Sequence, residues 1–174
     1  MSKDHFQLTT VTPSAHCTLH LTYADGEAFK VDLQDWIAST KALNPLTEAA
    51  LFATVQLGLG GRSVDWPGQI SGVDDTALEL DLGADNLRNL AVEQAGGIGH
   101  ERIWNWLHDT GLGLEQAAQA LGLSRRMLIY YRDGEKPIPR SVWLACLGWE
   151  AIRPTGPSLP RHIPSIQEYA ALHA

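Results

Sequence analysis

The stretch that most restricts the fold of this chain is Leu114–Leu128, where two short helical patterns flank a single glycine. Two helices that cross steeply need a small residue near the crossing, and Ala118 supplies one. The turn needs a residue that tolerates a left-handed backbone, which Gly122 does without a Cβ penalty. Ser124 is a favoured N-cap for the second helix. Together these residues predict a helix-turn-helix centred on Leu114–Gly134.

Apolar side chains around this motif are spaced to hold it on a core. Leu123 follows the turn glycine as an apolar plug, and three further residues point back to the core at helical spacing: Leu121, Leu128 and Tyr131. Two more helices are predicted at Glu101–Thr110 and Arg140–Ile152, with Gly111 as a C-cap residue. Four tryptophans of these helices are expected in the core: Trp104, Trp106, Trp143 and Trp149.

The first part of the chain alternates polar and apolar residues with period two, which indicates strands with one buried face. The segments His16–Tyr23 and Glu27–Leu33 flank Asp25-Gly26, a strong signal for a hairpin turn. Three more strands are predicted, at Phe6–Val11, Phe52–Leu57 and Ser63–Pro67. Short helices are expected at Leu33–Thr40 and from Pro45. The fold class is therefore an α+β N-terminal domain, with a small antiparallel sheet and short helices, followed by an all-α helix-turn-helix domain.

Four segments follow from these patterns. Residues 1–82 form the α+β domain, and residues 83–97 form a bridging helix with a Gly-rich link. Residues 98–153 form the helix-turn-helix domain. Residues 154–174 contain four prolines and are predicted to be an extended arm ending in a short helix.

The charge of the chain is divided unevenly between its halves. Residues 1–97 carry a formal charge of −8 and residues 98–174 carry +1, within a total of −7. Such asymmetry suggests different partners for the two halves. The placement of cations, rather than the net charge, must therefore support any argument for nucleic acid.

Several functional classes find no support in the sequence. No window approaches the roughly 18 apolar residues of a membrane span, and the N-terminus lacks a signal-peptide pattern, so we expect a cytoplasmic protein and no membrane partner. Cys17 and Cys146 lie too far apart in sequence for a CxxC motif and are expected to be free thiols. No nucleophile, acid–base pair or metal-ligand spacing forms a catalytic or metal site. We therefore expect no enzyme and no cofactor.

The run Leu121-Gly122-Leu123-Ser124-Arg125, together with Ala118, Leu128 and Asp133-Gly134, resembles the Cro/C1-type helix-turn-helix family over about Glu101–Ile152. The resemblance implies that the helix Ser124–Arg132 enters the major groove of double-stranded DNA. It also implies base contacts from Arg125, Arg126 and Tyr130. Met127 and Ile129 would touch thymine methyls or sugars, and Ser124 would bond a phosphate.

One position departs from the family pattern. Leu114 stands where the family often has a glutamine that contacts phosphate. Arg132, Lys136 and Arg140 are expected to compensate as phosphate contacts. The adjacent Arg125 and Arg126 favour a DNA role, because the positive end of the helix dipole disfavours cations at a helix N-terminus unless an anion lies opposite.

The N-terminal half resembles a small bacterial α+β domain family of unknown function with antitoxin-like members. The resemblance covers about Phe6–Asp81 and rests on Phe29–Leu33, Asn44-Pro45-Leu46, Phe52 and Val64–Pro67. It implies no enzymatic activity. Six acidic residues in this half would receive a basic, toxin-like protein partner, or simply keep the surface soluble: Asp65, Asp74, Asp75, Glu79, Asp81 and Asp85.

Three functional hypotheses follow. The first is a sequence-specific, homodimeric transcriptional regulator that reads a short operator. The second is an antitoxin-like module that neutralises a basic partner and represses its own operon through the helix-turn-helix. The third is a degenerate helix-turn-helix that serves assembly only, which Leu114 favours and Arg125-Arg126 opposes.

Overall fold

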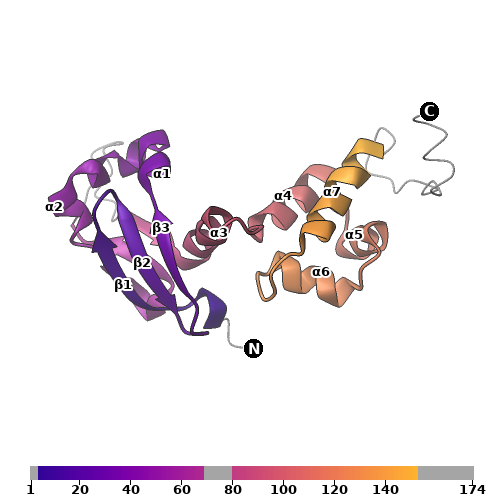
Figure 1. The fold of residues 1–174 in the computed structure, drawn as a ribbon, viewed down its shortest axis with the longest axis horizontal. Coiled ribbons are helices and arrows are strands. Elements are labelled where there is room, and N and C mark those ends of the chain that lie inside the picture. The colour runs from indigo at the N-terminus through magenta and orange to yellow at the C-terminus, as the bar shows by residue number, and fades with distance from the viewer. Residues whose placement is uncertain (1–3, 69–79, 153–174) are drawn as a thin grey trace. The chain divides into compact units, whose positions relative to one another are not determined.

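The computed structural model describes residues 4–68 and 80–152. The chain divides into two compact units, Met1–Gly99 and His100–Ala174 (Figure 1). The first unit combines antiparallel strands with short helices and the second is helical, which confirms the predicted fold class. Each unit has its own core, because the buried residues of the main cluster all lie between Leu8 and Ala91.

The first sheet of the N-terminal unit is a three-stranded antiparallel meander of β1 (Leu8–Ser14), β2 (Thr18–Tyr23) and β3 (Ala28–Asp32). The apolar side of β2 faces the core, where Leu19 and Leu21 are almost fully buried. The strand predicted from His16 begins two residues later. His16 and Cys17 instead make the β1–β2 turn with left-handed φ values of 58° and 50°.

A second three-stranded antiparallel sheet consists of β4 (Gln56–Leu57), β5 (Ser63–Trp66) and β6 (Leu80–Gly83). The sequence predicted one sheet and did not predict β6. The strand predicted at Phe52–Leu57 is wrong at its start, because Phe52 ends helix α2 (Ala49–Phe52), and only Gln56–Leu57 is extended. Phe52 is held there by its ring contact with Trp66, at 5.9 Å between centroids.

Short helices cover this unit. They are α1 (Gln34–Ser39) and α2, with the 3-10 segments η1 (Asp4–Phe6), η2 (Lys41–Thr47) and η3 (Leu59–Gly61). Buried polar groups are paired internally. The Tyr23 hydroxyl donates to the Ala84 carbonyl at 2.8 Å, and the indole N–H of Trp66 donates to the Phe52 carbonyl at 3.1 Å. The core of the first unit therefore leaves these two large polar side chains satisfied.

Helix α3 (Ala84–Gln94) belongs to the first unit. The predicted division placed residues 83–97 between the two domains as a bridge. In the structure Leu87 and Ala91 are buried in the first core, and Arg88 pairs with Asp25 at 2.8 Å. Its Leu87-Leu90-Ala91 spacing thus describes a helix that packs on the sheets of this unit.

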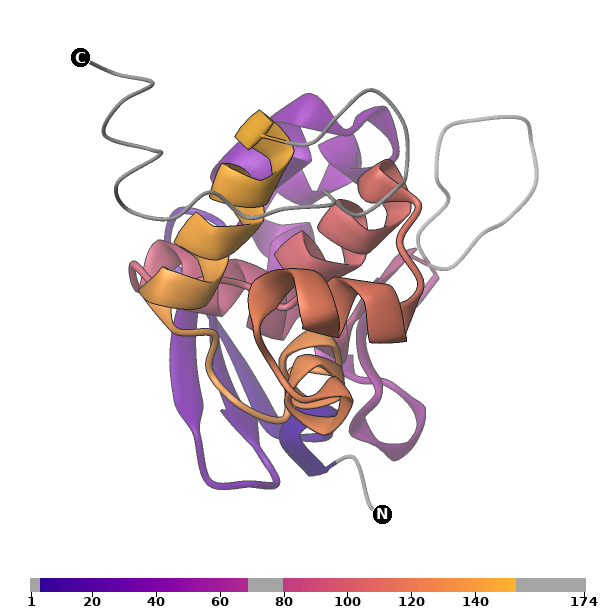
Figure 2. The same cartoon turned by 90° about the vertical axis from the view of Figure 1, so that its right-hand side faces the viewer.

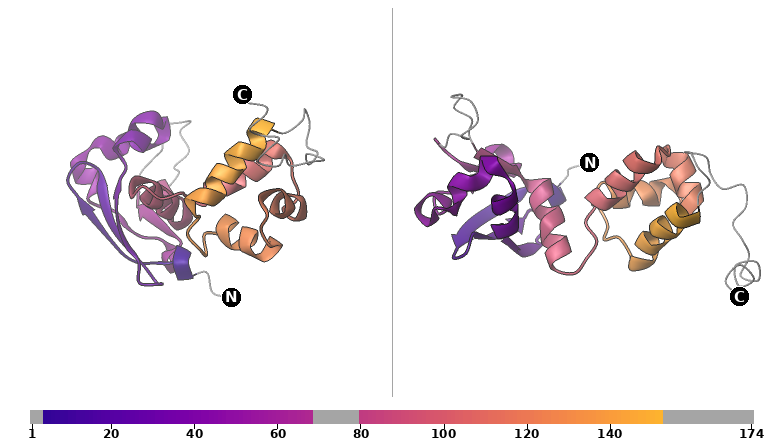
Figure 3. Two further views of the ribbon diagram at one scale, coloured as in Figure 1. Left: turned by 45° about the vertical axis from the view of Figure 1, so that its right-hand side comes forward. Right: turned by 90° about the horizontal axis from the view of Figure 1, so that it is seen from above.

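Residues 100–152, the described part of the second unit, form the helices α4 (Glu101–Thr110), α5 (Leu114–Leu121), α6 (Arg125–Arg132) and α7 (Arg140–Ile152) (Figures 1 and 3). These bounds match the predicted ones. Ile103 and Leu128 are fully buried, and the rings of Trp106 and Trp149 meet edge to face at 5.7 Å. The predicted arm, residues 154–174, lies outside the described residues.

The two cysteines are free, as predicted, with Cys146 buried and Cys17 half-buried. Burial and the nearby Glu150 carboxylate raise the pKa of the Cys146 thiol to about 12. Among residues 4–68 and 80–152, no helix is both long enough and apolar enough to span a membrane.

Candidate nucleic-acid interface

Helices α5 and α6 are joined by a turn whose chemistry matches the predicted motif (Figure 2). Gly122 adopts φ 67°, and the amide of Leu123 donates to the Ala118 carbonyl at 2.8 Å, which closes a Schellman-type helix end. Ala117 and Ala118 are buried where the two helices meet. The Ser124 hydroxyl caps α6 by accepting from the Met127 amide at 3.2 Å.

Helix α6 has a buried face and an outward face. Leu128 is fully buried and Tyr131 nearly so, which places both toward the core as predicted. At 100° per residue, the opposite face centres on Arg126, Ile129 and Tyr130. Arg126 is exposed, while Ile129 and Tyr130 are partly exposed. The surface available to a partner is therefore basic and aromatic, with one aliphatic side chain.

The structure brings together three of the predicted DNA contacts, Arg126, Tyr130 and Lys136, which we call the basic cluster. The Arg126 Nε donates to the Tyr130 hydroxyl one helical turn further on. The Arg126 guanidinium carbon lies 5.2 Å from the centroid of the Tyr130 ring, and the Lys136 Nζ lies 5.3 Å from it. Tyr130 thus orients both cations through cation–π contacts.

Arg125 lies beside this cluster at the first position of α6. Its side chain is 57% exposed, and its Nε is 3.9 Å from a Glu115 carboxylate oxygen that is itself exposed. A single long, exposed ion pair of this kind contributes little and is easily exchanged for another anion. Arg125 therefore remains available at the positive end of the helix dipole.

Arg132 occupies a different environment from the other predicted contacts. It makes a two-point ion pair with Asp133, at 2.7 Å and 3.1 Å, and its guanidinium lies 4.9 Å from the ring centroid of Trp104. Only 21% of its side chain is exposed. The prediction that Trp104 lies in the core is wrong, since this tryptophan is 51% exposed and packs beside Arg132.

Two of the remaining predicted DNA contacts, Met127 and Arg140, lie beside and after the outward face of α6. Met127 is partly exposed on the flank of α6, and Arg140 is exposed at the first position of α7.

Leu114, which departs from the family pattern, is half-buried at the start of α5. Gln116 lies one turn into the same helix, and its side-chain carbonyl accepts from the Gly113 amide at 3.2 Å. The sequence analysis did not identify this capping role, although glutamine at the third helical position is its usual signal.

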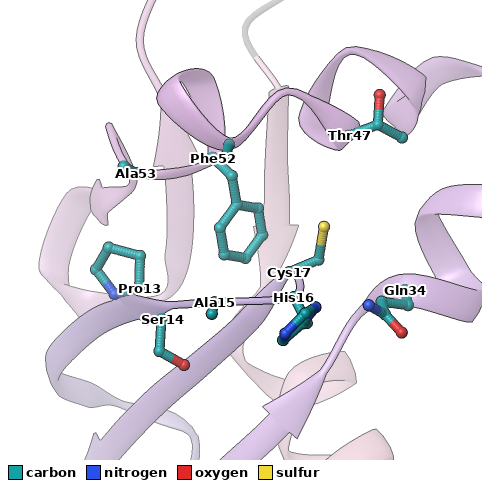
Figure 4. Close-up of a pocket in the computed structure, with 10 residues that line it drawn as sticks. Pro13, Ser14, Ala15, His16, Cys17, Gln34, Thr47, Phe52 and Ala53 are labelled. Carbon is teal, nitrogen blue, oxygen red and sulfur yellow. The ribbon is translucent and has the colours of Figure 1, made fainter.

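The first unit has a pocket of about 480 Å³ beside the left-handed β1–β2 turn. In Figure 4 the Phe52 ring and the Cys17 sulfur lie at its centre, with His16, Gln34 and Ser14 around it. The Cys17 thiol contacts the Leu46 carbonyl at 3.7 Å, and partial burial raises its pKa, as does the Asp32 carboxylate. This thiol is therefore poorly suited to act as a nucleophile.

The predicted acidic residues are only partly visible. Asp74, Asp75 and Glu79 lie outside the described residues. Asp65 and Asp81 stand directly opposite each other on β5 and β6, and Asp85 is exposed near the start of α3. Within the described parts of the chain, no three His, Cys, Asp or Glu side chains converge as a metal site would require.

Comparison with known proteins gives one informative match. A crystal structure described as "Putative DNA Binding Protein NE0471 from Nitrosomonas europaea ATCC 19718" is 42% identical to this chain. The two superpose with a TM-score of 0.73, over 91% of this chain and 96% of the other. No protein-family model matches the chain, and no curated protein matches it.

Proposed function

Since this chain belongs to the same family as the NE0471 protein of Nitrosomonas europaea, we propose that it binds double-stranded DNA with α6 as its recognition helix. The description of that relative as a putative DNA-binding protein supports the proposal. So does the turn between α5 and α6, whose left-handed Gly122 and Ser124 cap are what a helix-turn-helix requires.

The basic cluster is the single observation that carries the proposal. Arginine side chains that serve only solubility are usually unrestrained, whereas Arg126 is bonded to the Tyr130 hydroxyl and stacked near its ring. A planar guanidinium held in this way is ready to pair with the O6 and N7 acceptors of guanine. Such a contact contributes about 1–3 kcal/mol of discrimination between bases.

The other cations of the second unit take supporting roles in this proposal. Arg125, Lys136 and Arg140 contact phosphates, and the Ser124 hydroxyl adds a phosphate contact at the N-terminus of α6. Met127 and Ile129 contact thymine methyls or sugars at the edges of the helix. Arg132 is reassigned: its ion pair with Asp133 and its packing on Trp104 make it a residue that supports the end of α6.

The finer function that we propose is transcriptional regulation by a homodimer, without enzymatic activity. A single small helix-turn-helix covers only one half-site, so two copies would bind half-sites about 34 Å apart. The Cro/C1-type resemblance of Leu121–Arg125 supports this arrangement.

Filter binding of the full chain to genomic fragments at low salt tests the proposal. We expect retention of a subset of fragments, and the double variant Arg125→Ala/Arg126→Ala should lose the preference among them. Arg62→Ala is the matched control, because Arg62 is an exposed arginine of the first unit. Retention of no fragment at low salt, or equal losses in the control and the double variant, would contradict the proposal.

An antitoxin-like function is the second candidate, and one contact favours it. Asp65 and Asp81 are direct cross-strand neighbours, and like charges in that position destabilise a sheet unless a cation lies near them. A basic protein partner would supply that cation. Calorimetric titration with an arginine-rich peptide should show binding that Asp65→Asn/Asp81→Asn abolishes. Equal binding by this variant would count against the candidate.

A further inference from the structure

The outward face of α7 is apolar over most of its length. Leu144 is 56% exposed and Leu147 is 43% exposed, although both are leucines of a regular helix. Gly148 and Ala151 lie beside them and are also exposed. We call these four residues the α7 stripe. The opposite face of the helix packs into the unit through Val142, Cys146 and Trp149.

Charge is nearly absent from this helix. Arg140 at its first position and the half-buried Glu150 are its two charged residues. A helix that packs on a core with one face normally carries polar residues on the other, while a helix that is apolar all round is buried on all sides. The outward face of α6, with Arg126, shows the normal pattern. The composition of α7 therefore indicates that a second surface covers the α7 stripe.

Gly148 is an independent observation on the same face. A glycine inside a helix weakens it relative to alanine. A Cβ added at Gly148 would meet no atom within 4 Å, so packing within the described residues does not require a glycine there. A glycine allows another surface to approach the helix backbone closely. Gly148 opens a notch directly beside the two exposed leucines.

We propose that two copies of this chain pair through the α7 stripe, helix against helix, antiparallel about a two-fold axis at the level of Cys146. A two-fold interface must be self-complementary. Leu144 and Gly148 lie two residues on either side of Cys146, so in this arrangement each Leu144 meets Gly148 of the partner subunit. The leucine of one copy fills the notch of the other, and Leu147 lies close to the axis.

The electrostatics of the pairing are also favourable. Antiparallel helices place the positive N-terminal end of each dipole beside the negative C-terminal end of the other. Few charges on α7 need to be desolvated, since Arg140 lies at the helix end and Glu150 lies on the flank. One helix face offers less than the roughly 800 Å² per partner of a standard interface, so we expect a weak dimer in free solution.

This inference deepens the proposed function, because it names the surface that joins two DNA-binding copies, and it rests on that function only for its purpose. The pairing itself needs no DNA. Sedimentation equilibrium of the full chain, from micromolar to millimolar concentration, therefore tests it separately. We expect a reversible monomer–dimer equilibrium for the unmodified chain.

Two variants and one control make the test specific. Leu147→Glu places a charge on the axis and Gly148→Leu fills the notch, and each should raise the dimer Kd at least about tenfold. Leu59→Glu is the matched control, because Leu59 is 95% exposed on the first unit, and it should leave the Kd unchanged. Far-ultraviolet circular dichroism and the Tm establish that the variants fold.

A chain that stays monomeric to millimolar concentration would overturn the inference. Variants whose dimer Kd equals that of the control would also overturn it. A monomer that still retains DNA would leave the proposed function intact. A dimer that retains no DNA would contradict the proposed function and leave the pairing intact.

Discussion

Arg88 of the first unit and the pair Arg125-Arg126 of the second unit are used in opposite ways. Arg88 of the first unit is 14% exposed, pairs with Asp25 at 2.8 Å, and donates to the His5 carbonyl at 2.8 Å. Its guanidinium also lies 4.8 Å from the Tyr23 ring centroid. In the second unit, Arg125 and Arg126 are exposed at the N-terminus of a helix, and the ion pair between Arg125 and Glu115 is long, at 3.9 Å.

This difference shows why net charge is a poor guide to function here. A total of −7 argues against nucleic acid only if every cation counts equally. Arg88 makes its contacts within the fold and is not available to a partner. Arg132 resembles it within the second unit, because both arginines pair with an aspartate and pack on an aromatic ring. Four cations on and after α6 remain exposed to a partner: Arg125, Arg126, Lys136 and Arg140.

Removing the internal arginine should have the largest effect on stability. Arg88→Ala removes the partner of Asp25 and the packing of a mostly buried guanidinium on the Tyr23 ring, and it should lower the free energy of unfolding of the first unit by about 2 kcal/mol. Arg126→Ala, the matched change in the second unit, should cost less than about 0.5 kcal/mol. Urea unfolding of both variants checks this. Equal losses would break the distinction between the two kinds of arginine.

Arg132→Ala should fall between those two variants. It removes a two-point ion pair and the packing on Trp104, so we expect a loss of about 1–2 kcal/mol in the second unit. Its effect on DNA affinity should follow that loss of stability rather than show a change in base preference. A variant that unfolds normally yet changes the preferred fragments would return Arg132 to the set of base contacts.

Two glycine variants should shift stability in opposite directions. Gly122→Ala forces a Cβ into a left-handed turn at φ 67° and should cost about 1–2 kcal/mol. Gly148→Ala adds a methyl group where nothing lies within 4 Å and should stabilise the monomeric unit by up to about 1 kcal/mol. Thermal unfolding at low protein concentration measures both. A loss at position 148 would mean that the glycine is required inside the unit.

The Arg88–Asp25 pair also gives a small pH dependence confined to the first unit. Partial burial pushes the pKa of Asp25 upward, but hydrogen bonds from Arg88 and the Glu27 amide, with the nearby charges, bring it below its ordinary value. A lowered carboxyl pKa stabilises the fold above the unfolded pKa, and this contribution is lost as the pH falls below about 4. Asp25→Asn should flatten the acid limb of the stability profile. An unchanged limb would contradict the assignment.

Helices α5 and α6 and the turn between them could be predicted closely because their determinants are local. The turn glycine, the capping serine and the apolar residues that define the motif all lie within Ala118–Leu128. Helices α5, α6 and α7 begin and end at the residues that the sequence predicted. The i, i+4 spacing of Arg126 and Tyr130 was readable in the same way. Strand β6 and the end of α2 at Phe52 could not be predicted in this way, because both depend on tertiary contacts with β5.

The candidate site shows the same limit. The tendency of aromatic side chains to be buried placed Trp104 in the core, and this tendency cannot distinguish a core ring from one that packs beside Arg132 on the surface. Lys136 joins the basic cluster through the loop after α6, and loop geometry is not encoded by spacing. The sequence predicted α7 as a helix, but its apolar composition gives no sign of which side lacks a partner within its own unit.

Amide chemical-shift mapping during titration with a retained DNA fragment tests the central claim most directly. The account predicts that the largest shifts fall on Ser124–Arg132 and Lys136, with the β1–β2–β3 sheet unchanged and the shifts lost in Arg125→Ala/Arg126→Ala. Shifts that centre on the first unit, or that persist over α6 in the double variant, would contradict it.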